Sequence, residues 1–270
     1  MCESCVSFTP RVGRRSFLVG ALVAPVALVT HTRGAPARPA ASAAAVADIV
    51  VARGLAIKPR EAWAGSGYQA KSAIPAEDVK FLLVHHTATG NAYGHDGVID
   101  IIHGVYSSQT SEKGWPDTCY NFLIDRFGIV WEGRTGSIAG PVTADATGGS
   151  QGFAQLVCLI GDFTSVMPSE EQVASLRLTL AWLADRERID TSPEARVTFV
   201  SRGSNKWPAG VTITTPTIVG HREMTATACP GDTFYPRVRD VLPAEVHALR
   251  SGVQQTIGAT IPRSGLPEVR

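Results

Sequence analysis

The sequence predicts an α/β fold in which a mixed central sheet of about five to six strands is flanked by helices. Three observations predict this fold. Apolar runs of strand length recur along the chain, amphipathic segments with helical spacing lie between them, and no break in composition divides residues 46–250. The 270 residues are 44% hydrophobic and 18% charged, which suits a folded chain with a sizeable core. We therefore expect a single domain over residues 46–250.

Residues 1–45 have the composition of an export signal. Residues 13–18 (Gly-Arg-Arg-Ser-Phe-Leu) resemble a twin-arginine signal, and residues 17–29 form an apolar run too short to span a bilayer comfortably. Residues 35–45 are rich in Ala and Pro and offer small residues for a signal peptidase. We expect export to the cell exterior, cell wall or periplasm, and a monomeric mature chain without a membrane span. An uncleaved membrane anchor is the alternative.

Five short runs rich in apolar and β-branched residues are predicted to be strands. They are residues 81–86, 120–125, 129–132, 156–160 and 217–219. Arg-Phe-Gly separates the second run from the third, which predicts a hairpin. The first run ends in His85 and His86, and His221 follows the last by two residues. Both strands are therefore expected to deliver polar side chains to an edge of the sheet.

Apolar residues at helical spacing predict three helices. Asp96 is expected to cap the first, which continues to about Val105. Ser169 and Gln172 form a capping-box pattern at the start of the second. The third covers residues 235–249 and is interrupted by Pro243.

Two segments are predicted to lack regular structure. Residues 194–216 show no clear period and contain several turn-forming residues, so we expect a long surface loop, of a kind that often faces substrates. Residues 251–270 contain Gly, Pro and polar residues and are expected to form a disordered tail.

The charge distribution argues against nucleic acid as a partner. The formal net charge of +1 includes five Arg and one Glu in residues 1–45. Without that segment, the 25 basic and 24 acidic residues fall to 20 and 23. The mature chain has no excess of basic residues with which to bind nucleic acid or anionic lipid.

Three cysteines lie outside the export segment, an odd number for an oxidising compartment. A disulfide between Cys119 and Cys158 requires neighbouring strands, and Cys158, within Leu-Val-Cys-Leu-Ile, can equally be a small buried hydrophobic residue. Cys229 lies among polar and turn-forming residues and needs a different role.

His85, His221 and Cys229 are candidate ligands of a zinc ion. If the strands before the two histidines are neighbours, both imidazoles lie at one end of the sheet, and Cys229 follows His221 by eight residues. Two imidazoles and a thiolate suit zinc, and three protein ligands with an open fourth position are typical of a catalytic site. A structural site would need a fourth ligand, for which His86 and His95 are the nearby candidates. Histidines of the core or the surface are the alternative.

Six ordered motifs resemble the N-acetylmuramoyl-L-alanine amidase type 2 and peptidoglycan-recognition protein family. They are Val-His-His-Thr-Ala from residue 84, Gly-Trp-Pro-Asp from 114, Tyr-Asn-Phe-Leu-Ile-Asp from 120, Trp-Glu-Gly-Arg from 131, Gly-His-Arg-Glu from 220 and Thr-Ala-Cys-Pro-Gly-Asp from 227. The resemblance covers about residues 57–245, and residues 201–210 resemble the secreted actinobacterial branch. It implies a secreted Zn²⁺-dependent amidase that acts on peptidoglycan or muropeptides. The bond cut would join the muramic acid lactyl group to L-alanine of the stem peptide.

The resemblance also implies roles for individual residues. His85, His221 and Cys229 match the zinc ligands, and a zinc-bound thiolate would account for the odd cysteine. Tyr120 matches the catalytic tyrosine, which would orient water or hydrogen-bond the developing oxyanion. Thr227 matches a Thr or Lys position near the reacting carbonyl. A core tyrosine and a turn threonine are the alternatives.

Four residues are assigned to the wall of the substrate groove: His86, Ala146, Trp115 and Asn121. His86 has no ligand role in the match, so packing beneath the metal is its other interpretation. Ala146 stands where relatives carry a groove histidine. Gln109 likewise replaces a helix histidine, for which His103 is a candidate substitute. These departures bear on substrate preference and leave zinc binding intact.

Other functions remain open on the sequence. The main alternative is a peptidoglycan-binding recognition protein with little or no activity, because some family members have lost the cysteine ligand. A zinc peptidase on the same scaffold would share every ligand. A thermolysin-like site is disfavoured because Glu223 lies two residues after His221 instead of one. A cytosolic anhydro-muropeptide amidase is disfavoured because its usual third ligand is Asp.

Overall fold

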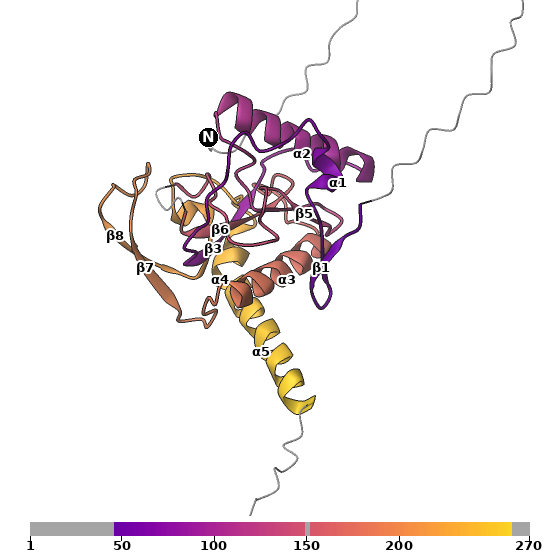
Figure 1. Cartoon of the computed structure of the whole chain (residues 1–270). Coiled ribbons are helices and arrows are strands. Elements are labelled where there is room, and N and C mark those ends of the chain that lie inside the picture. Colours follow the sequence, from indigo (N-terminus) through magenta and orange to yellow (C-terminus); the bar gives the residue numbers. More distant parts are fainter. Residues whose placement is uncertain (1–45, 149–151, 261–270) are drawn as a thin grey trace, which may run out of the picture.

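A seven-stranded mixed sheet lies at the centre of the computed structural model, which describes residues 46–148 and 152–260 (Figure 1). The predicted export signal and residues 261–270 lie outside the described residues. The strands follow the order β1-β2-β5-β4-β6-β3-β9. Their bounds are Ile49–Ala52 (β1), Leu55–Lys58 (β2), Phe81–His86 (β3), Phe122–Ile124 (β4), Val130–Glu132 (β5), Ala154–Leu159 (β6) and Ile218–Gly220 (β9). β1–β2 and β4–β5 pair antiparallel, and the other neighbours are parallel.

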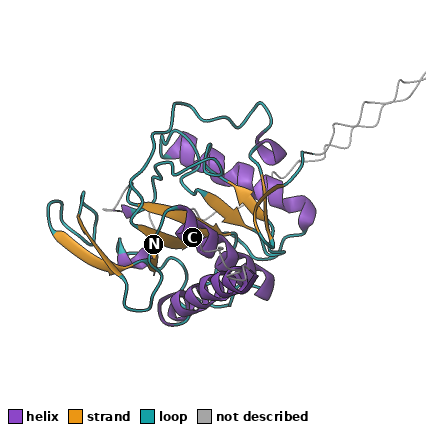
Figure 2. Ribbon diagram, turned by 60° about the horizontal axis from the view of Figure 1, so that its bottom comes forward, coloured by secondary structure: helices purple, strands orange, loops and turns teal. Residues whose placement is uncertain are grey.

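Helices cover both faces of this sheet (Figure 2). They are α1 (Glu61–Ala64), α2 (Val98–Ser107), α3 (Glu170–Arg186), α4 (Tyr235–Asp240) and α5 (Leu242–Thr260). α1 and α2 pack into one core cluster, and α3, α4 and α5 into another. The fold class is therefore confirmed as a single mixed α/β domain, and the sheet has one strand more than the upper expectation.

Strand β3 shows how the two cores divide the sheet. Leu82 and Val84 belong to the cluster under α3, whereas Phe81 and Leu83 belong to the cluster under α2. Because successive side chains of a strand point to opposite faces, His85 lies on the α2 side and His86 on the α3 side. Their neighbours agree, since His85 lies beside Tyr120 of the α2 cluster and His86 beside Phe163 of the α3 cluster.

Two local predictions are confirmed. β4 and β5 form the antiparallel hairpin predicted around Arg-Phe-Gly. At the start of α3 the Ser169 hydroxyl accepts from the backbone N–H of Gln172, and the Gln172 side chain accepts from the Ser169 N–H. This capping box satisfies two backbone donors that a helix start would otherwise leave without partners.

The prediction that Asp96 caps α2 is wrong. Asp96 lies within a short 3₁₀ turn, His95–Gly97, which runs directly into the helix. Gly97 holds the capping position without a side-chain hydrogen bond, and the Val98 N–H bonds to the His95 carbonyl instead. The preceding turn therefore satisfies a backbone N–H at the helix start that a capping side chain was expected to satisfy.

The long loop predicted over residues 194–216 is a hairpin. β7 (Arg196–Val200) and β8 (Thr212–Pro216) pair antiparallel as a separate two-stranded sheet. Phe199 of β7 and Ile213 of β8 are buried, and each lies between two exposed residues. Because each five-residue strand has only one fully buried hydrophobic residue, the alternating pattern is weak and the sequence did not reveal the hairpin.

The C-terminal helix also differs from the prediction. The helix is interrupted between Asp240 and Leu242, so residues 235–249 belong to two helices. Pro243 lies in the first turn of the second helix, α5. A proline is tolerated there because the first turn needs no internal N–H donor. α5 continues to Thr260, so residues 251–260 are helical and not part of a disordered tail. No proline follows Pro243 before that point to stop the helix.

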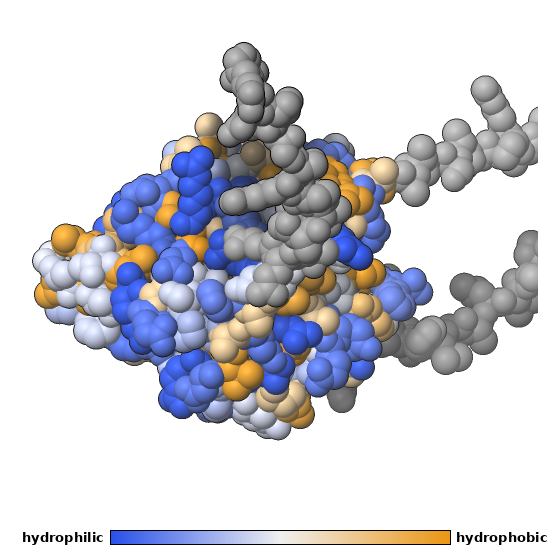
Figure 3. Space-filling view, turned by 90° about the horizontal axis from the view of Figure 1, so that it is seen from below, coloured by the Kyte–Doolittle hydropathy of each residue, from blue (hydrophilic) through white to orange (hydrophobic). Residues whose placement is uncertain are grey.

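Exposed hydrophobic residues are scattered over the described surface. In the view of Figure 3 they form small separate areas among hydrophilic residues. Val50 and Val200 are the most exposed, at 75% and 56%. Across the described ranges, every helix is too short or too polar to cross a membrane.

Candidate metal centre and adjoining pocket

The first two candidate ligands meet because their strands are neighbours in register. β3 and β9 pair parallel, with Val84 opposite Gly220, so His85 and His221 follow at the same level. Their ring centroids are 4.1 Å apart and both side chains are fully buried. The expectation that these two strand ends converge is confirmed.

The third candidate, Cys229, lies close to the ends of β3 and β9 because the loop after His221 folds back on itself. The Arg222 N–H donates to the Cys229 carbonyl at 3.2 Å, and the Gly231 N–H donates to the Ala228 carbonyl at 2.7 Å. Gly231 has φ 103°, and a Cβ there would overlap the backbone of Phe163. Only glycine permits this conformation and this close approach. The Cys229 Sγ consequently lies 3.6 Å from the His85 Nδ1.

These three residues fit a zinc ion. Their ligand atoms all lie within 4.8 Å of one another, and each side chain is buried. His85 Nε2 and both ring nitrogens of His221 are buried without a hydrogen-bond partner, so the protein leaves costly polar atoms unsatisfied here. Ligands of one tetrahedral zinc, at about 2.3 Å for sulfur and 2.0–2.1 Å for nitrogen, lie about 3.6 Å apart, like Cys229 Sγ and His85 Nδ1.

The electrostatics favour neutral side chains at His85 and His86. Burial lowers the pKa of His85 well below its usual value, and the neighbouring His221 and His86 lower it further. Burial also lowers the pKa of His86 to about 4. A neutral imidazole is the form that binds a metal, so His85 needs no proton release to act as a ligand.

The two predicted catalytic residues lie beside the candidate ligands. The Tyr120 ring centroid is 5.3 Å from that of His85, and the side chain is 1% exposed. Thr227 is half-buried, and its hydroxyl accepts from the Cys229 N–H at 3.2 Å. Both residues therefore border the metal centre, one from the segment before β4 and the other from the loop that carries Cys229.

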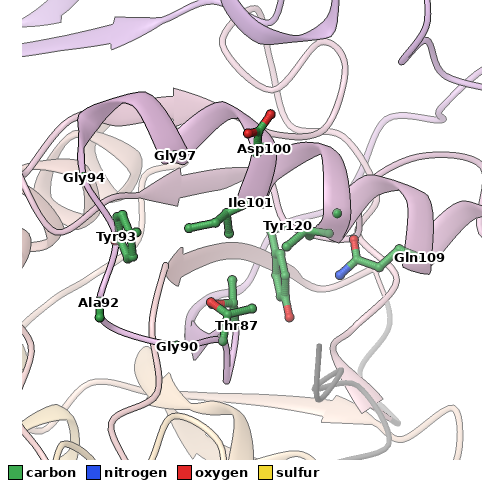
Figure 4. Close-up of a pocket in the computed structure, with 13 residues that line it drawn as sticks. Thr87, Gly90, Ala92, Tyr93, Gly94, Gly97, Asp100, Ile101, Gln109 and Tyr120 are labelled. Atoms are coloured by element: carbon green, nitrogen blue, oxygen red, sulfur yellow. The ribbon is translucent and has the colours of Figure 1, made fainter. Parts of the chain in front are cut away.

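A pocket of 570 Å³ adjoins this centre (Figure 4). Helix α2 forms one wall and the segment after β3 the other, and Tyr120 lies at the end that borders His85. Ile101 and Val105 give the helix wall an apolar surface, whereas the Asp100 carboxylate points away from the middle of the pocket. The pocket therefore offers an extended, mostly apolar binding surface that ends at the metal centre.

The four residues assigned to the groove wall, His86, Ala146, Trp115 and Asn121, do not line this pocket. His86, Asn121 and Ala146 are at most 2% exposed. The Asn121 side chain bonds to the Ser137 hydroxyl, the Val142 carbonyl and the Leu156 N–H, so it has a structural position. The His86 Nδ1 accepts from the Phe163 N–H, which agrees with packing beneath the metal.

Gln109 lines the pocket, and His103 does not. Figure 4 shows Gln109 beside Tyr120, and the Gln109 Oε1 accepts from the Cys119 N–H at 2.9 Å. His103 stacks on Tyr68 and contacts the Trp63 carbonyl through Nε2, so it does not replace the helix histidine. No disulfide joins Cys119, Cys158 and Cys229, the three cysteines of the described chain.

The sequence patterns did not indicate several residues that line the pocket. Thr87, Thr89, Tyr93, Ile101 and Val105 all line the cavity. Ile101 and Val105 are four residues apart in α2, so they share one face of the helix, and both are only partly buried. This apolar face is the sequence pattern that could have indicated a pocket wall.

The sheet, the buried His/His/Cys group and the adjoining pocket define a candidate mononuclear metal site in an α/β domain. The family model of N-acetylmuramoyl-L-alanine amidases (Amidase_2) matches residues 75–232, which is more than half of the chain. The protein therefore belongs to this family. The match includes all three candidate ligands.

Similar proteins of low sequence identity include amidases and peptidoglycan-recognition proteins. An N-acetylmuramoyl-L-alanine amidase of Sus scrofa is 27% identical over 186 residues, which are 68% of this chain. Peptidoglycan-recognition protein SC2 of Drosophila simulans is 23% identical and is covered to 86%. The match spans only about a quarter of the length of the pig and human amidases, at 27% and 28%.

Solved structures support the fold. The ectodomain complex of peptidoglycan recognition proteins LCa and LCx bound to tracheal cytotoxin matches with a TM-score of 0.53 at 23% identity, over 68% of this chain and 95% of that chain. Drosophila PGRP-LB matches with the same TM-score at 19% identity, over 68% and 93%. These likenesses concern the fold alone.

Proposed function

We propose that the protein is a secreted zinc-dependent N-acetylmuramoyl-L-alanine amidase. Its substrate would be peptidoglycan or a muropeptide, and the bond cut would be the amide between the muramic acid lactyl group and L-alanine. The observation that carries this proposal is the buried group of His85, His221 and Cys229, which adjoins Tyr120 at the end of a pocket. Export through the twin-arginine-type signal in residues 1–45 is part of the proposal.

The residues divide the work of amide hydrolysis. A zinc ion held by His85, His221 and Cys229 would supply Lewis acidity, which an unreactive amide and a weakly nucleophilic water both need. The Tyr120 hydroxyl is assigned to orient the attacking water or to donate a hydrogen bond to the developing oxyanion. Thr227, neutral and short, donates a second hydrogen bond to that oxygen. The apolar wall at Ile101 and Val105 holds the substrate beside these groups and excludes bulk water.

Product analysis tests the proposal. The protein is incubated with zinc and defined muramyl-peptides, and the products are identified by mass spectrometry beside a Cys229→Ala variant. We expect a free peptide that begins at L-alanine, and its loss in the variant. A zinc peptidase would instead leave alanine on the sugar, which would contradict the proposed bond specificity.

The second candidate is a recognition protein with little or no activity. Gln109 and Ala146 stand where the family resemblance implies histidines, and relatives such as SC2 carry the name of peptidoglycan-recognition proteins. Binding of the muropeptide without any product, with zinc in place, would establish this candidate in place of the amidase.

A further inference from the structure

We propose that the tip of the β7–β8 hairpin positions the loop that carries two of the three candidate metal ligands. We call residues 204–207 the hairpin tip and residues 221–229 the ligand loop. The inference rests on the proposed function, because it assigns the hairpin a part in holding His221, Thr227 and Cys229 for metal binding and catalysis.

Four consecutive side chains of the hairpin tip each donate to a backbone carbonyl of the ligand loop. Ser204 Oγ bonds to Met224 at 2.9 Å, Asn205 Nδ2 to Ala226 at 3.3 Å, Lys206 Nζ to Arg222 at 2.6 Å and Trp207 Nε1 to Glu223 at 2.8 Å. The ligand loop has little regular structure beyond the short turn His221–Glu223. The hairpin tip therefore provides hydrogen bonds that a helix or sheet would otherwise supply.

Asn205 makes the most specific of these contacts. Besides donating to the Ala226 carbonyl, its Oδ1 accepts from the Ala226 N–H at 2.7 Å and from the Thr225 hydroxyl. One amide side chain thus holds both polar groups of residue 226. The next residue is Thr227, which is assigned to the reacting carbonyl, so Asn205 fixes the backbone from which Thr227 projects.

The hairpin tip is itself rigidly built. The Ser204 hydroxyl accepts from the N–H groups of Lys206 at 3.2 Å and Trp207 at 3.0 Å, and the Ser204 N–H donates to the Trp207 carbonyl at 2.8 Å. These bonds close a compact turn and leave the four side chains directed at the ligand loop.

The hairpin is anchored to the strand that carries the remaining ligand. The Phe199 ring stacks on Phe81 with centroids 5.5 Å apart, and Phe199 is 5% exposed. Phe81 begins β3, and β3 delivers His85 to the metal centre. The hairpin therefore links the rigid strand of one ligand to the irregular loop of the other two.

The ligand loop holds itself together mainly near its ends. The N–H groups of Met224 and Thr225 bond to the His221 carbonyl, and the Arg222 N–H bonds to the Cys229 carbonyl. The middle of the loop, at Ala226, is exposed and is tied to Asn205. Without these ties the Thr227 hydroxyl and the Cys229 thiolate would sample more positions, which weakens metal affinity and slows a reaction that depends on geometry.

The test compares the Asn205→Ala/Trp207→Phe double variant with a control in the same hairpin. Thr214→Val is the matched control, because it removes an exposed hydrogen bond to Thr198, at 2.9 Å, far from the ligand loop in the hairpin ladder. Zinc affinity is measured by chelator competition, the thiolate–Co²⁺ charge-transfer band by absorption, and loop protection by hydrogen exchange over residues 222–229.

We expect the double variant to bind zinc about tenfold more weakly, as loss of supporting contacts around metal ligands does elsewhere. Its Co²⁺ band should shift and its ligand loop should exchange faster, while Tm stays close to that of the wild type. kcat should fall with KM unchanged, since the hairpin tip does not line the pocket. An aspartate at this position (Asn205→Asp) keeps the acceptor for the Ala226 N–H, so it should retain part of the zinc affinity that alanine loses.

The inference is overturned if the double variant keeps wild-type zinc affinity, Co²⁺ band and exchange in residues 222–229. It is equally overturned if Thr214→Val reproduces the losses, since general weakening of the hairpin would then explain them. A wild type that binds zinc and cleaves nothing would refute the proposed amidase. The metal-affinity and exchange measurements would still decide the role of the hairpin tip.

Discussion

The candidate metal centre and the adjoining pocket are built in different ways, although Tyr120 borders both. His85 and His221 sit at the ends of paired strands, fully buried, in positions fixed by the register of the sheet. The pocket is bounded by α2 and the segment after β3, and Ile101 and Val105 of its wall are only partly buried. A centre held by register should lose function abruptly on substitution, whereas a wall of partly exposed side chains should lose it gradually.

The largest effect is expected from Cys229→Ala. This change removes one of three ligand atoms from a buried centre, so zinc affinity should fall by more than about 100-fold and amidase activity should disappear. Zinc retained after dialysis, measured by elemental analysis, checks the expectation. Cys158→Ala is the control, because it removes another fully buried thiol, one that packs in the α2 core, and should leave zinc bound. Full zinc occupancy in Cys229→Ala would exclude it as a ligand.

Tyr120→Phe should have the next largest effect. The ring beside His85 and its packing stay, while the hydroxyl is lost, so kcat should fall by about 100-fold or more with zinc content unchanged. Steady-state kinetics on a muramyl-peptide measure this.

Tyr93→Phe is the matched control for that experiment. Tyr93 also lines the pocket, but its hydroxyl donates to the Ile160 carbonyl and accepts from the Arg126 N–H, so its role is structural. We expect a loss of stability there with kcat nearly unchanged. Equal losses of kcat in the two variants would remove Tyr120 from the catalytic group.

Gln109→Met tests the connection between the two regions. The substitution removes the acceptor of the buried Cys119 N–H, so the free energy of unfolding should fall by about 1–3 kcal/mol. Because Cys119 directly precedes Tyr120, kcat should also fall, by about tenfold. Denaturant unfolding and kinetics measure both. Gln69→Met, at an exposed glutamine of the loop after α1, should change neither quantity. An unchanged stability in Gln109→Met would show that the bond to Cys119 contributes nothing.

Short local motifs predicted which residues meet at the candidate metal centre. The two histidines lie at the ends of short apolar strands. When two such strands pair in parallel, their carboxyl ends meet at the same edge of the sheet, so the two side chains are brought close together. The position of Cys229 depends on Gly231, whose need for glycine follows from contact with Phe163, 68 residues earlier in the chain. The Ala-Cys-Pro-Gly motif indicated the residue types, and only the folded chain shows the contact.

The pocket wall and the hairpin were harder to predict because long-range contacts define them. Asn121 and Ala146 follow motif order but are buried, and Asn121 bonds to Ser137 and Leu156 of later segments, so motif order alone did not reveal their exposure. Residues 194–216 carry a weak alternating pattern, and Phe199 gains its partner only when Phe81 of β3 packs against it. Local sequence thus specified strand ends and left open which loops cover them.

The smallest effect is expected from Ile101→Ala in the pocket wall. Ile101 is half-buried in α2 and lines the cavity, so shortening it removes part of an apolar contact with a bound stem peptide. A loss of about 1 kcal/mol of binding free energy corresponds to a KM about fivefold higher, with kcat unchanged. Ile99→Ala is the matched control, since Ile99 is also half-buried in α2 and lies outside the pocket lining. Both variants should lose similar stability, so a higher KM in Ile101→Ala alone assigns the effect to the pocket. Equal KM values in the two variants would show that the substrate binds elsewhere. The expectation that substitutions in the pocket wall reduce function gradually would then be wrong, whereas the expectation for the metal ligands would be unaffected.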